Sequence, residues 1–169
     1  LRAISVLRPG VENAYPEIRS NPEALLRFGV AMDEWRVLGA DSEYDWNNRK
    51  ENLLSSDRKL WLTGKDAPYP HWIAVDTGKK QQIRGLIVTP PKTAECDMGP
   101  VFRYRILVGD TPETIETPVA EGTFDNIRNN PLPQIVNFPS PVSARCFRFE
   151  ALESANGSCY AGLTRIELF

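Results

Sequence analysis

Most of the chain from residue 35 onward consists of short apolar runs in which hydrophobic and polar residues alternate. Such alternation, interrupted by Gly, Pro, Asn and Asp, is typical of half-buried β-strands. The clearest runs span residues 35–38, 71–76, 82–89, 102–108, 136–138, 145–150 and 163–169, and a weaker one lies within 113–124. Short strands at intervals of about ten residues, without long helices, predict an all-β fold, either an antiparallel sandwich or a barrel.

A short helix is predicted ahead of these strands. Asn21 is a favourable capping residue, Pro22 suits the first helical position, and Glu23 follows near the positive end of the helix dipole. Gly29 ends the apolar residues that come next. We therefore expect residues 1–32 to form a lead-in segment with a short helix, or the tail of a preceding domain, and residues 33–169 to form the β domain.

Length and charge narrow the class of protein. The 169 residues, 41% of them hydrophobic, are enough for one domain with a substantial core. A net charge of -2 gives no electrostatic reason to bind nucleic acid or an anionic membrane. No apolar run approaches the ~20 residues that cross a bilayer. Because the sequence begins at Leu1 and shows no signal peptide, we expect a mature fragment of a larger multidomain chain.

The three cysteines, Cys96, Cys146 and Cys159, are far apart and form no CxxC or Cys/His cluster, which argues against a zinc site. Cys96 and Cys159 fall in polar loops, whereas Cys146 lies within a strand pattern. In an oxidising compartment the pair expected to form a disulfide is Cys96–Cys159. Three free thiols are the alternative, and the sequence leaves both open.

The chain lacks the usual patterns of catalytic residues. It has no nucleophile-elbow, phosphate-loop, zinc-protease or dinucleotide motif. Its single histidine, His71, stands at the start of a predicted strand, where a hydrogen-bonded structural role is the better interpretation. Asp41, Glu43 and Asp45 share an early loop and fit a solvated face as well as a site. We expect a protein that is not an enzyme.

The order of six sequence blocks resembles the discoidin family, also called F5/8 type C domains. The blocks are WRVLGADSE, LWLTG, PHWIAVDTGKKQQIRGLIVTP, RYRILVGD, ARCFRF and LTRIELF, and PHWIAVDTG matches the family signature PhWi.vDlG. The resemblance covers residues 33–169 and implies a jelly-roll β-sandwich of about eight antiparallel strands, with a ligand held by loops at one end. Bacterial members are the galactose-binding-like family 32 carbohydrate-binding modules, and animal members bind phospholipid or proteins.

The chain departs from the family pattern where many sugar-binding members contact their ligand. Leu62 stands where those members carry a histidine after the tryptophan, and leucine can form no hydrogen bond. Pro90 and Pro91 followed by Lys92 replace a Pro-Arg pair, and lysine lacks the bidentate fork of arginine. Asp97 corresponds to a family asparagine and still accepts hydrogen bonds.

The family's structural calcium site is also altered. Its ligand positions read Leu54-Ser55-Ser56, Lys59 and Arg165 in this chain. Calcium requires about six to eight oxygen ligands, and two cationic side chains would repel it. We therefore expect no calcium and no other cofactor, with Lys59 or Arg165 bonding the same loop carbonyls instead.

The candidate binding site lies on four loops expected at one end, residues 43–50, 64–70, 91–99 and 154–160. A sugar site combines a flat aromatic face with polar side chains. Trp46, in a strongly polar stretch, is the foremost candidate, and packing onto the sandwich edge is its alternative. The candidate residues are Glu43, Tyr44, Trp46, Lys65, Tyr69, Lys92, Asp97 and Tyr160. Trp35, Trp61 and Trp72 are assigned to the core, and a Cys96–Cys159 bridge would order two of the loops before binding.

These observations favour a non-catalytic carbohydrate-binding module of a secreted, periplasmic or cell-surface protein, in the setting of bacterial glycan utilisation that the resemblance implies. Two alternatives remain: a protein- or matrix-adhesion module of the same fold, and a structural spacer that packs against a neighbouring domain through residues 1–30. The carbohydrate hypothesis requires Trp46 or Tyr160 to be exposed beside polar side chains.

Overall fold

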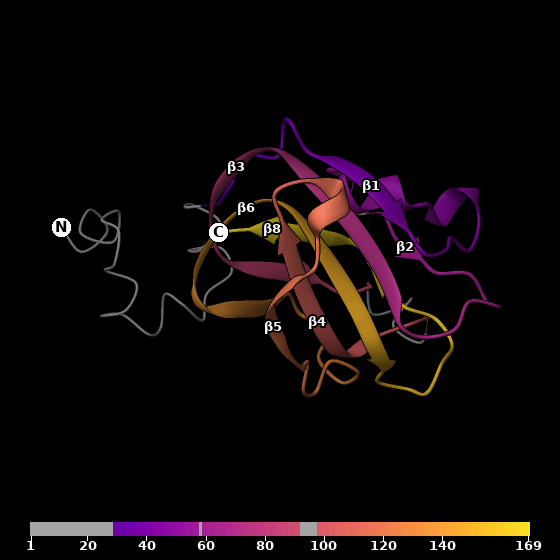
Figure 1. Cartoon of the computed structure of the whole chain (residues 1–169). Coiled ribbons are helices and arrows are strands. Elements are labelled where there is room, and N and C mark those ends of the chain that lie inside the picture. Colours follow the sequence, from indigo (N-terminus) through magenta and orange to yellow (C-terminus); the bar gives the residue numbers. More distant parts are fainter. Residues whose placement is uncertain (1–28, 58, 92–97) are drawn as a thin grey trace.

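The computed structural model describes residues 29–57, 59–91 and 98–169, which form an antiparallel β-sandwich (Figure 1). Eight strands lie within the described residues, although several of their bounds differ from the predicted runs. They are β1 (Arg36–Ala40), β2 (Trp61–Leu62), β3 (His71–Thr89), β4 (Val101–Gly109), β5 (Thr117–Thr123), β6 (Gln134–Ser154), β7 (Gly162–Leu163) and β8 (Arg165–Leu168). The helical elements described are three short 3-10 helices, η2 (Trp46–Asn48), η3 (Lys50–Leu54) and η5 (Pro112–Thr114). The helix expected at residues 21–28 lies outside the described residues, and the proposed domain boundary remains a prediction.

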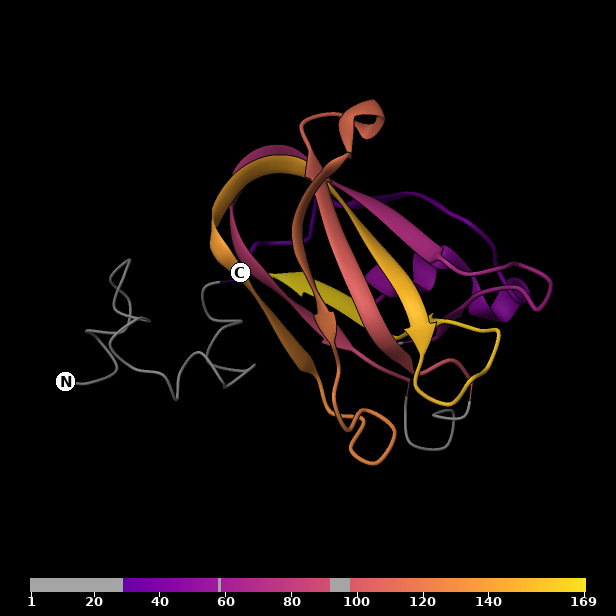
Figure 2. The ribbon, with the colours of Figure 1, turned by 60° about the horizontal axis from the view of Figure 1, so that its bottom comes forward.

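Two long, bent strands, β3 and β6, contribute to both layers of the sandwich. The first half of β3 pairs with β1 and with the second half of β6, which continues to β4 and β5. The second half of β3 pairs with the first half of β6 and with β8. Figure 2 shows the two strands curving together from one layer into the other. The sequence predicted two separate strands in each case, whereas shifts of register, such as that between Asp76 and Gln81, bend β3 without ending it.

The core fills the space between the two layers. It includes Ile73 and Phe149 from one layer and Leu86 and Leu168 from the other, each almost completely buried. Trp61 is wholly buried, as predicted. The alternation of β3 places every second side chain in this core, which fixes the orientation of the residues between them.

Trp72 is not in the main core, so its assignment was wrong. Because Ile73 and Val75 face inward, alternation turns Trp72 to the outer face of the sheet, where it is half buried. There it packs with a small cluster that contains Leu107 and Cys146. Its ring lies over Gly39, at a distance where a Cβ on Gly39 would make an ordinary van der Waals contact of 3.5 Å. Trp35, by contrast, is buried and meets Phe147 edge to face at 5.9 Å.

The bend of β3 is held by the buried carboxylate of Asp76. Arg36 and Arg145 each donate two hydrogen bonds to it at 2.8–3.1 Å, and the Gly78 N–H donates a fifth at 2.8 Å. The Arg145 bonds outweigh the opposing effect of burial and, with Gly78 and Arg36, hold the pKa of Asp76 well below its usual range. Gly78 has a φ of 83°, and a Cβ there would come within 2.6 Å of Glu34, so the bend requires glycine.

Candidate functional site

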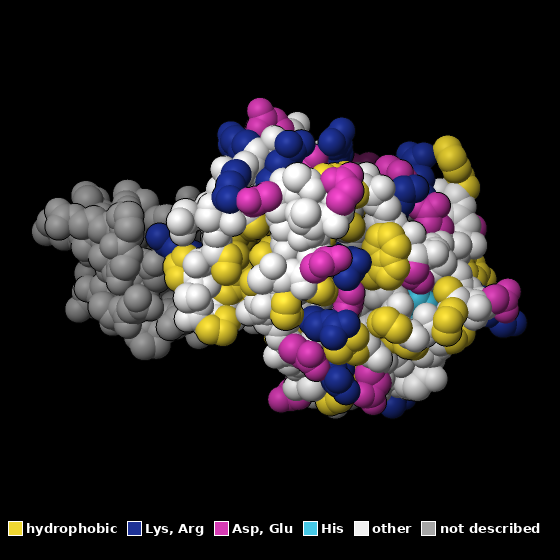
Figure 3. Space-filling view, viewed as in Figure 1, with side chains coloured by type: hydrophobic (Ala, Val, Ile, Leu, Met, Phe, Trp, Pro, Cys, Tyr) yellow, Lys and Arg dark blue, Asp and Glu magenta, His cyan; other side chains and the backbone are white. Residues whose placement is uncertain are grey.

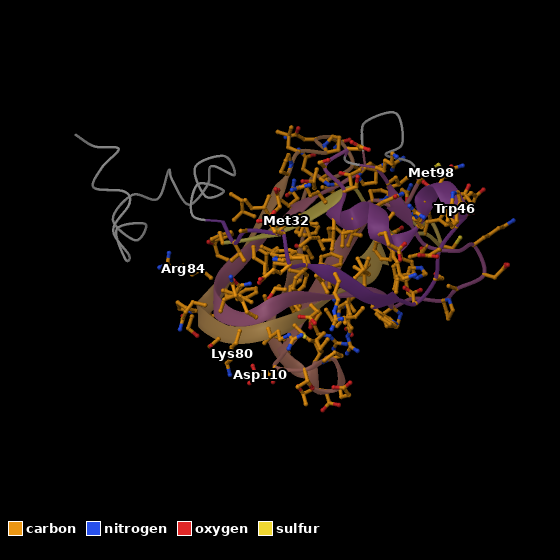
Figure 4. All side chains as sticks on the ribbon, turned by 90° about the horizontal axis from the view of Figure 1, so that it is seen from above. Met32, Trp46, Lys80, Arg84, Met98 and Asp110 are labelled. Atoms are coloured by element: carbon orange, nitrogen blue, oxygen red, sulfur yellow. The ribbon has the colours of Figure 1, made fainter. Side chains whose placement is uncertain are left out.

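Three of the four loops expected at one end of the sandwich are described in the structure, and hydrogen bonds connect them. The Gly64 N–H donates to the Ser42 hydroxyl at 3.0 Å, and the Tyr44 N–H donates to the Leu62 carbonyl at 2.8 Å. On the other side, the Tyr69 hydroxyl donates to the Tyr160 carbonyl at 2.6 Å. These bonds join the loops around residues 41–50, 64–70 and 155–160 into one surface, which we call the loop end. Figure 4 shows Trp46 and Met98 on the side of the molecule opposite Arg84.

Aromatic side chains cover part of the loop end. Tyr44 is 46% exposed and meets the Tyr160 ring edge to face at a centroid distance of 5.8 Å. Trp46 follows two residues later and is 78% exposed. That exposure contradicts the alternative in which Trp46 packs onto the sandwich edge. In Figure 3, hydrophobic side chains reach the surface over the part of the molecule where β1 and β2 are labelled in Figure 1.

The backbone under Trp46 is firmly held even though its side chain is free. Asp45 caps η2: its Oδ1 accepts from the backbone N–H groups of Asn47 and Asn48 at 2.8 and 2.9 Å. The buried amide of Asn52 donates to the Asn47 carbonyl at 2.6 Å and to the Leu60 carbonyl at 2.8 Å. The indole is therefore exposed from a turn that is already ordered.

Arg49 covers one face of the Trp46 ring. Its guanidinium carbon lies 4.5 Å from the ring centroid, a cation–π geometry. A planar ligand can therefore stack only on the opposite face of the indole. Arg49 also limits the rotation of a side chain that few other groups touch.

The remaining described candidates differ in how far their polar atoms are engaged. Glu43 accepts from the Lys50 N–H at 2.7 Å and from its ammonium at 3.3 Å, both through Oε1. Lys65 is exposed on the loop 64–70. Partial burial, together with the neighbouring Cys159, Tyr44 and Asp66 groups, raises the pKa of the Tyr160 phenol. Lys92 and Asp97 lie outside the described residues, so their part in the site remains a prediction.

His71 is the hydrogen-bonded structural histidine that the sequence predicted. It is fully buried, its Nδ1 lies 2.7 Å from Asp41 Oδ2, and its Nε2 lies 2.7 Å from the Cys159 carbonyl oxygen. Burial lowers its pKa, but the hydrogen bonds to Asp41 and Cys159 and the charge of Asp41 outweigh this and raise it overall. Burial likewise opposes ionisation of Asp41, yet the bonds from His71, Trp72 and Ser42 hold the pKa of Asp41 below its usual range.

The three carboxylates of the early loop are thus more than a solvated face. Asp41 bonds His71, Glu43 holds the start of η3, and Asp45 caps η2. The sequence could not assign the role of Asp41, because His71 and Trp72, to which it bonds, lie 30 and 31 positions away in the chain. It also missed Arg49, although a position three residues after Trp46 in a helical turn was a usable signal.

The residues at the family's calcium position do not fit that ion. Arg165 donates from Nη1 to the Ser55 carbonyl at 3.1 Å and from Nε to Glu167 at 2.7 Å. This bond is a contact of the kind that the sequence predicted for Arg165, and the absence of calcium remains a prediction. Lys59 instead lies 3.6 Å from the Asp57 carboxylate. Within the described part of the chain, no group of three or more His, Cys, Asp or Glu side chains is placed to hold a metal ion.

Two other sequence predictions concern the same end. Leu62 is completely buried in β2, so it contributes no ligand-binding group. Cys159 is exposed with a free thiol among the described residues, and Cys146 is buried as its strand pattern indicated. Since Cys96 lies outside the described residues, the Cys96–Cys159 bridge remains a prediction.

The fold and this loop end were compared with known proteins. The family model of the F5/8 type C domain matches residues 38–166. The chain belongs to the F5/8 type C domain family. Among curated proteins, none matches.

Several solved carbohydrate-binding modules have a similar fold. A family 32 module of NanJ from C. perfringens, in complex with galactose, is 22% identical with a TM-score of 0.68, covering 83% of this chain and 96% of that one. A Clostridium perfringens module in complex with GalNAc-β-1,3-galactose is 18% identical with a TM-score of 0.72, covering 83% and 99%. A chitosan-binding module of a Paenibacillus sp. IK-5 chitosanase/glucanase, in complex with chitotriose, is 18% identical with a TM-score of 0.64, covering 80% and 96%. At this identity the matches establish the shared β-sandwich fold.

No helix among residues 29–57, 59–91 and 98–169 has the length and apolar character to cross a membrane.

Proposed function

We propose that this domain is a non-catalytic carbohydrate-binding module that binds a glycan at the loop end, on the surface formed by Tyr44, Trp46 and Tyr160. The observation that carries the proposal is Trp46, an indole 78% exposed on an ordered turn. Exposing so large an apolar ring, covered by Arg49 on one face only, forgoes about 2 kcal/mol of burial free energy. A glycan that stacks its apolar C–H face on the ring recovers part of that energy.

The geometry favours a shallow, one-sided contact. Arg49 covers one face of the indole, which leaves the other for a sugar ring. The edge-to-face pair of Tyr44 and Tyr160 extends the aromatic surface beside it. Glu43 Oε2, which accepts no bond within the described residues, and the exposed Lys65 supply polar groups for hydroxyls. Because a single stacking platform buries little area, we expect dissociation constants of roughly 0.1–1 mM.

The chemistry of the ligands in similar structures supports a glycan without selecting one. Galactose, GalNAc-β-1,3-galactose and chitotriose are bound by the three modules named above. In this chain Leu62 replaces the histidine expected for galactose binding, and it is buried. Recognition would therefore depend on the aromatic surface and on Glu43, Lys65, Lys92 and Asp97.

The setting and cofactor requirement follow from the same proposal. A glycan-binding module without catalytic groups functions as part of a larger secreted, periplasmic or cell-surface protein. It requires no calcium, because Arg165 already bonds the loop carbonyl near which the ion would lie.

The test is a glycan array followed by calorimetric titration of its strongest ligands. Wild type should bind at least one glycan family, and Trp46→Ala should lose about tenfold or more in affinity while keeping the wild-type melting temperature. Leu132→Ala is the matched control, because Leu132 is also a large exposed apolar side chain, at 58%, but on the loop between β5 and β6. Equal binding by wild type and Trp46→Ala would contradict the proposed surface. Silence of wild type across the array would favour an adhesion or spacer role.

A further inference from the structure

Three segments of the loop end converge on the single histidine. Asp41 leads into the turn that carries Tyr44 and Trp46, and its Oδ2 lies 2.7 Å from His71 Nδ1. Cys159 precedes Tyr160, and its carbonyl oxygen lies 2.7 Å from His71 Nε2. The Tyr69 ring packs against the imidazole at 4.4 Å and donates its hydroxyl to the Tyr160 carbonyl. The imidazole is thus the bridge between the two loops that supply the aromatic surface.

The partners of the imidazole define its proton state. A backbone carbonyl can only accept a hydrogen bond, so Nε2 must carry a proton to bond the Cys159 oxygen. An ionised carboxylate also only accepts, so Nδ1 must carry a proton to bond Asp41. Asp41 is held in its ionised form by two further donors, the Trp72 N–H at 2.7 Å and the Ser42 hydroxyl at 2.9 Å. Both ring nitrogens are therefore placed to donate, which is the hydrogen-bonding pattern of an imidazolium.

We propose that His71 is a positioning residue of the glycan site: its imidazolium joins the loop of Tyr44 and Trp46 to the loop of Tyr160, and the aromatic surface is held together only while the ring is doubly protonated. The proposal rests in part on the proposed function, because it concerns the regulation of the same site. The predicted consequence is glycan binding that weakens as the solution becomes alkaline.

The direction of the pH effect follows from the groups that face the ring. Asp41 faces Nδ1 from the loop after β1, Tyr69 packs on the ring from the loop before β3, and Cys159 faces Nε2 from the loop before β7. Burial, above all, raises the pKa of Tyr69 to about 12, so its phenol stays neutral over the relevant range. A histidine whose pKa is raised on folding stabilises the fold below its unfolded value and loses that contribution as pH rises through the folded value.

The first experiment needs no glycan. Because His71 is the only histidine in the sequence, its imidazole signals in NMR spectra of the domain are unambiguous. We expect ¹⁵N shifts of a doubly protonated ring at neutral pH, a titration midpoint above the ordinary value of about 6.5, and parallel changes in the Tyr160 and Trp46 ring signals. A ring with one protonated nitrogen at neutral pH, or a titration that leaves those aromatic signals unchanged, would overturn the proposal.

The sharpest variant is Asp41→Asn, which should invert the response to pH. Its amide oxygen can replace Oδ1 in accepting from Trp72, and its NH₂ can replace Oδ2 and donate to an unprotonated Nδ1. A neutral ring then bonds both loops, because its Nε2–H donates to the Cys159 carbonyl and its Nδ1 accepts from the new amide. Protonation of Nδ1 would bring its N–H against the NH₂ of the amide, and two donors cannot bond each other. The imidazole of this variant should titrate below the ordinary histidine range, with the aromatic signals changing on the acid side. A purely structural histidine would give no such inversion.

Binding supplies the last measurement, with neutral oligosaccharides from the array as probes because they do not titrate. From about pH 6 to about pH 9, wild-type affinity should fall by three- to tenfold, whereas Asp41→Asn should bind as well or better at the higher pH. Cys159→Ser should retain the wild-type profile, which separates the imidazole from the exposed thiol. His71→Gln, which cannot titrate, should bind independently of pH. If wild type binds no glycan, the NMR experiments still decide the imidazolium bridge, so its failure and that of the proposed function remain distinct.

Discussion

The first half of β3 has a buried, hydrogen-bonded titratable side chain at each end, His71 and Asp76, and their partners differ. At the loop end, His71 bonds Asp41 and the Cys159 carbonyl. At the bend, Asp76 accepts five hydrogen bonds, four of them from Arg36 and Arg145. Arginine stays charged at every pH that a protein meets, whereas histidine changes charge near neutrality. The bend is therefore fixed, and the loop end can respond to its surroundings.

The surface at the loop end and the surface at the bend also differ in the side chains that they expose. Large exposed hydrophobic side chains of the described residues include Tyr44, Trp46 and Met98 at the loop end. The bend instead shows charged side chains that pair with one another, such as Lys80 and Asp110 at 2.6 Å (Figure 4). Charged side chains that pair with each other have little capacity left to bind a ligand. An exposed indole, by contrast, gains burial free energy when a ligand covers it. The bend therefore stabilises the fold, and the loop end is the surface that we propose for binding.

The largest effect expected is that of Asp76→Ala. It leaves two arginines without their shared carboxylate at a site where Asp76 is wholly buried, and we expect a loss of about 3 kcal/mol in the free energy of unfolding. Because the pKa of Asp76 is lowered on folding, its contribution is complete above the ordinary value of 3.8 and declines in more acidic solution. Urea unfolding at neutral and acidic pH measures both. Unchanged stability, or weaker glycan binding by the folded variant, would contradict the division of roles.

Arg165→Met is the next test, because it asks whether a side chain or a metal holds the loop before β2. The variant loses the bonds to Ser55 and Glu167, and we expect it to be destabilised by about 1–2 kcal/mol. Chelation of divalent ions with EDTA should leave the wild-type melting temperature unchanged, since the arginine replaces the cation. Arg165→Lys, which keeps the charge but not the fork, should recover part of the loss. A fall in melting temperature with EDTA would show that a metal site persists.

Much of the fold could be predicted from the sequence, because alternation and turn residues determine strands locally. The β5 and β8 strands follow from such signals, whereas the jelly-roll sandwich was implied by the family resemblance of the six blocks. The continuity of β3 through Gly78 could not be predicted, because it depends on Asp76 meeting Arg145 from β6, 69 positions away. Trp72 was misplaced because hydrophobicity was given more weight than the strand alternation that turns it outward.

Of the candidate site, the sequence could predict an exposed aromatic residue but not the hydrogen bonds beneath it. A tryptophan among polar residues indicated Trp46, since such a ring has little to pack against nearby. The two partners of His71 could not be predicted from the sequence, because they come from opposite halves of the chain and one of them is a backbone carbonyl. Sequence patterns therefore identified the exposed surface of the site, whereas the hydrogen bonds that hold it required the structure.

A smaller effect is expected for Tyr69→Phe, which removes one hydroxyl at the loop end and leaves the bend untouched. The lost bond to the Tyr160 carbonyl, 2.6 Å long, should cost about 1 kcal/mol of stability and about threefold in glycan affinity. The Phe ring still packs on His71, so the histidine titration should remain close to that of wild type. Thermal unfolding measures the loss of stability, and calorimetric titration measures the loss of glycan affinity. A loss of stability with unchanged affinity would mean that the Tyr160 loop is ordered without this bond.

The smallest effect is expected for Lys80→Ala, at the bend. Its ammonium lies 2.6 Å from Asp110, yet the side chains are 54% and 55% exposed, so water and salt screen the pair. We expect a change below about 0.5 kcal/mol, which falls further in high salt. Lys80→Ala and Asp76→Ala each remove one partner of an ion pair at the bend of β3, but only Asp76 is buried. Their comparison therefore separates the effect of burial from that of charge. A loss comparable to that of Asp76→Ala would show that the bend depends on its exposed charges, and that its stability is as sensitive to the solution as the loop end.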